Sequence, residues 1–168
     1  AILFQHPEVL ATVKADPMLL DAAFSEFKRR DGVVVYEDRE LNEAVTWYGT
    51  TIPAGAIVRV AMISANNDET VFADPRRFDL TRPDLRLGKE SRAGGRIDGV
   101  ANHLGFGLGK HFCIGYQLAR MEIVTATQRL LERFPDLRLV PGSTPRLTID
   151  WFHRYVDGLV VETGPARA

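Results

Sequence analysis

The sequence contains only one cysteine, Cys113, so no disulfide bond can form within the chain. Because disulfide frameworks belong to oxidising compartments, we expect a reducing compartment and a cytoplasmic protein. No apolar run approaches the roughly 20 residues that a membrane-spanning helix needs, so no membrane segment is predicted. The formal net charge is only -1, which argues against recruitment of nucleic acid or an anionic membrane by a field of one sign.

An initiating methionine is also absent, and residues 1–4 already belong to an apolar pattern. We therefore expect a chain that is truncated at its N-terminus. Its 168 residues, of which 45% are hydrophobic, are enough for one folded unit with a core. The sequence predicts a single portion over residues 1–168, without internal repeats.

Three helices are predicted from apolar periodicity and from residues that begin or end helices. The first spans residues 7–16 and has Pro7 in its first turn, where proline is favoured. The second spans residues 17–30, and its apolar stripe consists of Leu20, Ala23, Phe24 and Phe27. The third follows Cys113 and ends at Pro135, and its apolar stripe consists of Ala119, Ile123, Ala126 and Leu130.

Short strands are predicted where β-branched residues cluster. Three of them cover residues 33–36, 45–51 and 57–62, and a turn at residues 53–55 joins the last two. A short helix over residues 64–72 follows. Strands near the C-terminus are predicted at residues 137–140, 147–151 and 159–161. Between these groups, residues 73–102 lack periodicity and are predicted to form a long loop.

The most informative stretch reads Phe106-Gly107-Leu108-Gly109-Lys110-His111-Phe112-Cys113-Ile114-Gly115. It places the lone cysteine in a glycine-rich loop that leads directly into a helix. A helix N-terminus stabilises a thiolate, and glycines let the backbone approach a flat or bulky group closely. The residues by themselves leave two interpretations open: a thiolate presented to a metal or cofactor, or a buried structural thiol.

This stretch resembles the haem-binding loop of the cytochrome P-450 family, the haem-thiolate monooxygenases, at every fixed position of the pattern F-G-x-G-x-H-x-C-x-G. The resemblance implies that the Cys113 thiolate is the ligand of the iron of haem b. It implies that Phe106 shields the sulfur and that His111 binds a haem propionate. Three glycines would expose backbone amides to the sulfur: Gly107, Gly109 and Gly115.

Two further motifs resemble those of the same family and follow its order along the chain. Glu26-Phe27-Lys28-Arg29 is similar to the family's E-x-x-R, and Phe72-Ala73-Asp74-Pro75-Arg76-Arg77-Phe78 is similar to F-x-x-P-x-R-F. The resemblance implies a buried structural triad of Glu26, Arg29 and Arg77. Taken alone, E-x-x-R is a weak signal, because surface i,i+3 ion pairs with the same spacing are common.

Arg39 stands where the family usually has an arginine that binds a haem propionate; the alternative is a solvated loop charge. Residues 33–36 and 152–154 would face the substrate pocket by the same resemblance. A charged insert at residues 84–102 would steer an acidic electron donor, or would simply be a solvated loop. Its charged residues are Asp84, Arg86, Lys89, Glu90, Arg92, Arg96 and Asp98.

The resemblance as a whole implies a mainly α fold with small β-sheets, corresponding to the C-terminal part of the cytochrome P-450 fold. The implied function is insertion of one oxygen atom of O2 into a small organic substrate, with electrons from a ferredoxin or flavoprotein. The family's oxygen-activating helix has no counterpart in this sequence. Two alternatives therefore stand: a truncated, non-catalytic haem-binding or assembly module, and one half of a split enzyme completed by the missing N-terminal portion.

Overall fold

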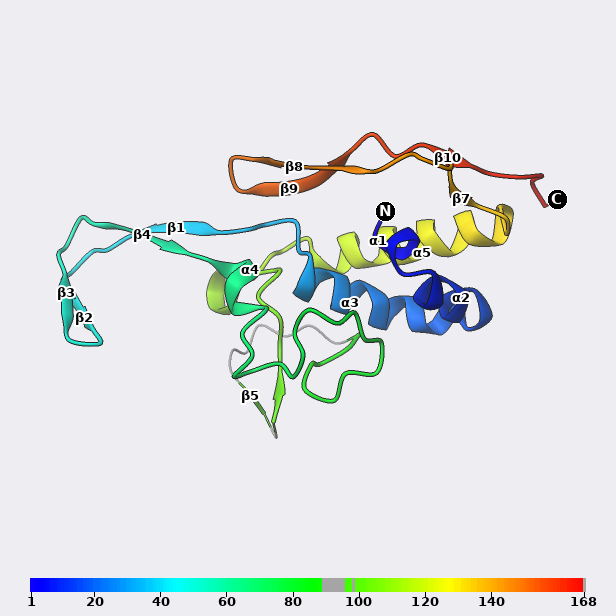
Figure 1. The fold of residues 1–168 in the computed structure, drawn as a ribbon. Coiled ribbons are helices and arrows are strands. Elements are labelled where there is room, and N and C mark those ends of the chain that lie inside the picture. Colours follow the sequence, from blue (N-terminus) through cyan, green and yellow to red (C-terminus); the bar gives the residue numbers. More distant parts are fainter. Residues whose placement is uncertain (89–95, 98, 168) are drawn as a thin grey trace.

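The computed structural model describes residues 1–88, 96–97 and 99–167. Its helical layer consists of α2 (Pro7–Ala15), α3 (Leu20–Arg30) and α5 (Tyr116–Arg133), with the short elements α1 (Ile2–Gln5) and η1 (Pro17–Leu19) at the start of the chain. Figure 1 shows α3 and α5 side by side, with α2 at one end of the pair. The three helices predicted from periodicity are confirmed to within a few residues.

The core lies between α2, α3 and α5. Leu20 and Ala23 of α3 pack with Val9 and Val13 of α2 and with Phe78 from the long loop. From α5, Val124 and Leu131 pack against this cluster. The predicted stripe of α3 is therefore its buried face.

The predicted stripe of α5 lies on a different side of that helix. Its members Ile123 and Leu130 are 44% and 46% exposed, whereas Val124 and Leu131 face the core. Spacing alone cannot distinguish these two apolar faces, because both follow the helical repeat. The structure thus leaves one apolar face of α5 open.

In the described ranges, five two-stranded antiparallel sheets accompany the helices. β1 (Glu37–Glu40) pairs with β4 (Ile57–Val60), and the hairpin of β2 (Val45–Trp47) and β3 (Thr50–Ile52) lies between them in sequence. In Figure 1 this ribbon extends away from the helices and carries the hairpin at its far end. The prediction of one strand over residues 45–51 is wrong, because Tyr48 and Gly49 take φ values of 49° and 78° and form a two-residue turn.

Three other predicted segments differ from the elements that the structure contains. Residues 33–36 form only an isolated bridge between Val34 and His153, and the strand β1 begins after them. The short helix predicted at residues 64–72 is instead α4 (Met62–Ala65). β5 (Arg96–Ile97) and β6 (Val100–Ala101) pair within the long loop.

The C-terminal strands are β7 (Arg138–Leu139), β8 (Arg146–Asp150), β9 (His153–Asp157) and β10 (Val161–Glu162). β8 pairs with β9, and β7 pairs with β10. β9 was not predicted, because its residues are mostly polar and exposed. In Figure 1 the hairpin of β8 and β9 lies above the helices and extends beyond the start of α5. Residues of the hairpin and of α5 line one apolar groove.

The arrangement of helices with small sheets confirms the predicted fold class. Within the described ranges, no helix combines the length and the apolar character needed to cross a lipid bilayer.

Candidate functional site

The ligand loop, residues 104–115, connects β6 to α5 and presents Cys113. Its turns depend on Gly107 and Gly109, whose φ values of 72° and 68° are strained for residues with a Cβ. The backbone N–H of Cys113 donates to the carbonyl oxygen of Phe106 at 2.9 Å and closes the loop. The thiol of Cys113 is exposed, so it is free to bind a partner outside the protein core.

An aromatic cluster supports the loop from within. The ring of Phe106 lies 6.0 Å from Phe24 of α3, 6.2 Å from Phe112 and 6.0 Å from Tyr116, measured between centroids. Phe112 and Tyr116 meet edge to face at 4.8 Å. Because these rings come from α3, from the loop and from α5, they hold the loop against both helices.

A buried network of charges lies on the C-terminal half of α3, close to the aromatic cluster. Glu26 and Arg29 are fully buried, and their side chains form two parallel hydrogen bonds of 2.8 Å. Arg29 also donates to the carbonyl oxygens of Asn66 at 2.8 Å and Pro75 at 2.7 Å. The alternative of a solvated surface pair is therefore wrong for E-x-x-R.

The second guanidinium of this network is Arg82, and the prediction of Arg77 is wrong. Arg82 Nε donates to Glu26 Oε1 at 2.9 Å, and the Arg82 side chain is 2% exposed. The side chain of Arg77 is 65% exposed and pairs with Asp79. Arg77 contributes only its carbonyl oxygen, which accepts from Arg82 Nη2 at 3.0 Å.

The physical reason is the path of the chain after Phe78. The N–H of Asp79 donates to Glu26 Oε1 at 3.1 Å, so the backbone itself occupies the place next to the carboxylate. A turn held by Asp79 and Thr81 then reverses the chain and brings Arg82 back to Glu26. Burial alone would lower the pKa of Arg82, but its hydrogen bond and ion pair with Glu26 raise that pKa above the usual value. In the sequence, the only sign of this arrangement was that Arg82 follows Phe78, the last residue of the F-x-x-P-x-R-F motif, by four positions.

Asn66 links this network to the ligand loop. It is 2% exposed, its carbonyl oxygen accepts from Arg29, and its side-chain Oδ1 accepts from the N–H of Leu104 at 2.6 Å. Leu104 stands two residues before Phe106. The buried charges therefore fix the start of the loop, although sequence reasoning did not assign Asn66 a role.

Arg39 and His111 are both accessible. Arg39 lies on β1, where its side chain is 56% exposed and pairs with Glu37 at 2.6 Å. His111 lies in the single turn η2 (Gly109–His111) of the ligand loop and is exposed. Their roles as propionate ligands stay predictions.

The two segments expected to line a substrate pocket lie side by side. The N–H of Val35 donates to the carbonyl oxygen of Phe152 at 2.8 Å, and the N–H of Arg154 donates to the carbonyl oxygen of Val33 at 2.6 Å. Arg154 also pairs with Asp31 at the end of α3. Backbone hydrogen bonds thus join residues 33–36 to residues 152–154, although the two segments are far apart in the sequence.

The charged insert falls partly outside the described residues, since residues 89–95 and 98 are not described; these include Lys89, Glu90, Arg92 and Asp98. Of its other members, Asp84 accepts from the N–H of Ala73 at 2.7 Å and contacts Arg82. Asp84 is therefore part of the buried network's surroundings.

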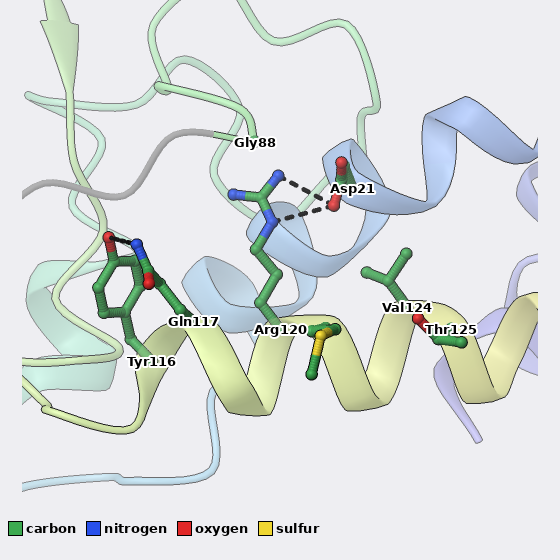
Figure 2. A pocket seen from close by; sticks show the side chains of 8 residues that line it. Asp21, Gly88, Tyr116, Gln117, Arg120, Val124 and Thr125 are labelled. Carbon is green, nitrogen blue, oxygen red and sulfur yellow. Dashed lines mark hydrogen bonds and ion pairs between the residues drawn. The ribbon is translucent and has the colours of Figure 1, made fainter.

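Two hollows adjoin α5. A groove of about 580 Å³ lies between α3, α5, the N-terminal residues and the β8–β9 hairpin, and its lining is mostly apolar. A second pocket of about 480 Å³ lies between α3, α5 and Gly88. Figure 2 shows its main polar feature, the pair of Arg120 and Asp21, whose atoms are 2.9 Å apart. Tyr116 lines this pocket as well, so the pocket adjoins the aromatic cluster.

The exposed face of the ligand loop fits a flat apolar group with a metal at its centre. The thiol stands in the open, and a Cβ built on Gly109 would meet no atom within 4 Å. Leu108 and Ile114 of the same loop are apolar and are 38% and 96% exposed. A thiolate donor in a loop that also exposes apolar side chains suits the iron of a porphyrin.

Comparison with known proteins agrees with this geometry. The sequence profile of the family described as Cytochrome P450 matches residues 15–166. The chain is 41% identical over 138 residues to Cytochrome P450 107B1 of Saccharopolyspora erythraea, which covers 82% of this chain and 30% of that protein. It is 38% identical over 132 residues to a steroid C26-monooxygenase of Mycobacterium tuberculosis, covering 79% of this chain and 31% of the relative.

Solved structures match over nearly the whole chain. The structure of CYP109E1 from Bacillus megaterium with testosterone has a TM-score of 0.82 and 26% identity, covering 97% of this chain and 41% of that one. CYP105N1 from Streptomyces coelicolor has a TM-score of 0.81 and 30% identity, covering 99% of this chain and 38% of that one. The chain thus spans about 30% of the length of the curated relatives that it matches.

Proposed function

Because the chain belongs to the cytochrome P-450 family, we propose that it is the haem-ligating C-terminal portion of a monooxygenase that inserts one oxygen atom into an organic substrate. The observation that carries the proposal is the exposed thiol of Cys113 in a loop fixed by the buried network of Glu26. The cofactor is haem b. When bound, it supplies the oxygen chemistry that thiolate donation favours.

The chain's own residues hold and tune that cofactor. Cys113 donates its thiolate, and the N-terminus of α5, together with backbone amides near Gly107, Gly109 and Gly115, favours the negative charge there. Phe106 covers the sulfur from the protein side. The rigid support matters because a ligand held in one geometry loses little entropy when the cofactor binds.

Arg39 and His111 bind the propionates in this proposal. Both side chains are accessible, and both are donors of the kind that carboxylates accept. Arg39 then exchanges its pairing with Glu37 for a propionate. This exchange costs little, because an exposed ion pair contributes at most about 1 kcal/mol.

The substrate is a small organic molecule that meets the junction of residues 33–36 and 152–154. Electrons come from a ferredoxin or flavoprotein, and the protein acts in the cytoplasm. Val33, Phe152 and the neighbouring groove are apolar, which suits a substrate with unactivated C–H bonds.

The rest of the catalytic unit covers the open apolar surfaces. Ile123 and Leu130 on α5 and the groove beside them lack a covering layer within the described ranges. The matched relatives are about three times as long as this chain, so the family fold contains material of the required size. In our proposal this material carries the oxygen-activating residues, either in the same polypeptide or as the other half of a split enzyme.

A second candidate is a non-catalytic module that binds haem or assists assembly. The two candidates predict the same haem ligand and differ only in turnover.

The test is spectroscopic. The chain is loaded with haem, reduced and exposed to carbon monoxide, and we expect the strongly red-shifted Soret band of thiolate ligation. The variant Cys113→Ser is expected to lose this band. The control variant Arg77→Ala retains Cys113 and is expected to keep the band. Haem uptake without a red-shifted band in the wild type would overturn the proposal. Turnover with electron donors then separates the enzyme from the non-catalytic module.

A further inference from the structure

Lys28 is a buried charge next to the ligand loop. It lies on α3 between Glu26 and Arg29 in sequence, and only 5% of its surface is exposed. Its Nζ atom lies 4.4 Å from the centroid of the Phe106 ring. A desolvated ammonium over an aromatic face is an energetically significant contact, so Lys28 and Phe106 hold each other in place.

The approach of Lys28 to the loop depends on Gly105. A Cβ at position 105 would lie 2.9 Å from the carbonyl oxygen of Lys28 and 3.1 Å from its Cε atom. Both the backbone and the side-chain stem of Lys28 therefore pack directly against the residue before Phe106. A side chain at this position would push the ammonium away from the loop.

Phe106 connects Lys28 to the metal ligand. Its carbonyl oxygen accepts the N–H of Cys113 at 2.9 Å, while its ring contacts the Lys28 ammonium. A shift of Phe106 thus moves the backbone that orients Cys113. The charge of Lys28 also lies in a poorly solvated region, where screening is weak.

We propose that Lys28 is a positioning residue of the ligand loop, which holds Phe106 in place and whose positive charge favours the reduced state of the bound haem. The inference rests on the proposed function, because it needs a haem at Cys113. Reduction adds one electron from the redox partner to ferric iron, gives ferrous iron and makes the site more negative by one charge. The Lys28 ammonium contacts Phe106, whose carbonyl oxygen accepts the N–H of Cys113, and its positive charge would stabilise that additional negative charge.

The test is a reductive titration of the haem-loaded protein with optical detection. Lys28→Met keeps an unbranched stem and removes the charge; we expect reduction to become about tenfold less favourable, which for one electron is about 59 mV. Lys28→Gln, a second neutral variant, is expected to shift in the same direction. Lys28→Arg, which keeps the charge, and the surface control Lys14→Met are expected to stay near the wild type.

The outcomes separate the two proposals. A wild type without the red-shifted carbon monoxide band overturns the proposed function and this inference with it. A normal band, together with a wild-type potential in both neutral variants, overturns the role of Lys28 alone. An equal shift in Lys28→Arg and Lys28→Met would also overturn the role of the charge, since it would trace the effect to packing.

Discussion

At the scale of the residue, Glu26 keeps a fully buried carboxylate because every side of it is satisfied. Arg29 binds it with two hydrogen bonds, Arg82 adds a third, and the N–H of Asp79 adds a fourth. Removal of one cation from such a group leaves a buried charge without compensation. Removal of one cation from an exposed ion pair lowers the free energy of unfolding only slightly.

Arg82→Ala is therefore expected to lower the free energy of unfolding by about 3–5 kcal/mol, because it leaves the Glu26 carboxylate short of a buried partner. Urea denaturation followed by circular dichroism measures the change. Arg77→Ala is the matched control, and its expected cost is at most about 1 kcal/mol. If the two variants lost equal amounts of unfolding free energy, Arg77 rather than Arg82 alone would have to support Glu26.

Asp79 gives the stability a pH dependence in the acid range. Burial raises its pKa, but hydrogen bonds from the N–H and hydroxyl of Thr81 and the contact with Arg77 outweigh this and hold the pKa below its usual 3.8. A carboxyl with a depressed folded pKa contributes stability above its unfolded pKa and loses it as the pH falls through the folded value.

We therefore expect the melting temperature of the wild type to fall below about pH 4 partly through Asp79. Asp79→Asn lacks this contribution at every pH, so the difference in melting temperature between the wild type and the variant becomes smaller as the pH falls. Calorimetry from about pH 6 to about pH 2 measures it. A gap that widens in acid would contradict the lowered pKa.

At the scale of the element, α5 has two apolar faces, of which one is packed against the core and the other is exposed. Val124 and Leu131 pack against the core, whereas Ile123 and Leu130 remain about half exposed. A long helix with an uncovered apolar stripe is an association surface.

The double variant Ile123→Ser and Leu130→Ser is expected to reduce self-association of the chain and to change its free energy of unfolding by about 1 kcal/mol or less. Sedimentation and urea denaturation measure the two effects. In the matched control Leu131→Ala, the expected cost is about 2 kcal/mol, because a partly buried leucine is lost from the core. A larger cost for the serine variant would mean that its stripe is the buried face.

At the scale of the whole molecule, the described chain is, in our proposal, a scaffold for one side of the haem. The ligand loop, the buried network and the aromatic cluster lie together. The groove beside α5 and the β8–β9 hairpin stays open in the described chain. Covering this groove should stabilise the chain by the apolar area removed from water.

Joining the chain to the upstream portion of Cytochrome P450 107B1, the relative with 41% identity, is therefore expected to raise the melting temperature and to slow hydrogen exchange in α5 and β8. Exchange measured by mass spectrometry on the chain alone and on the joined protein tests this. The double variant Ile123→Asp and Leu130→Asp should abolish the gain, since it would place charges in the new interface. Unchanged exchange in α5 would contradict the proposed cover.

The sequence by itself determined the helices, the glycine-rich ligand loop with Cys113, and the pairing of Glu26 with Arg29. These features depend on residues that are close together, such as the helical repeat of Leu20, Ala23 and Phe24 or the i,i+3 spacing of the ion pair. Local geometry decides them before any distant contact forms.

Only the tertiary structure decided which arginine reaches Glu26, which face of α5 is buried and how the strands pair. Each of these depends on where the chain returns after a loop: Arg82 reaches Glu26 across 56 positions, and β1 finds β4 beyond an intervening hairpin. The same holds for Lys28 and Phe106, which are far apart in sequence and in contact in space. Burial is a property of the packed molecule, so a local pattern cannot say which of several equivalent charges or apolar faces it will cover.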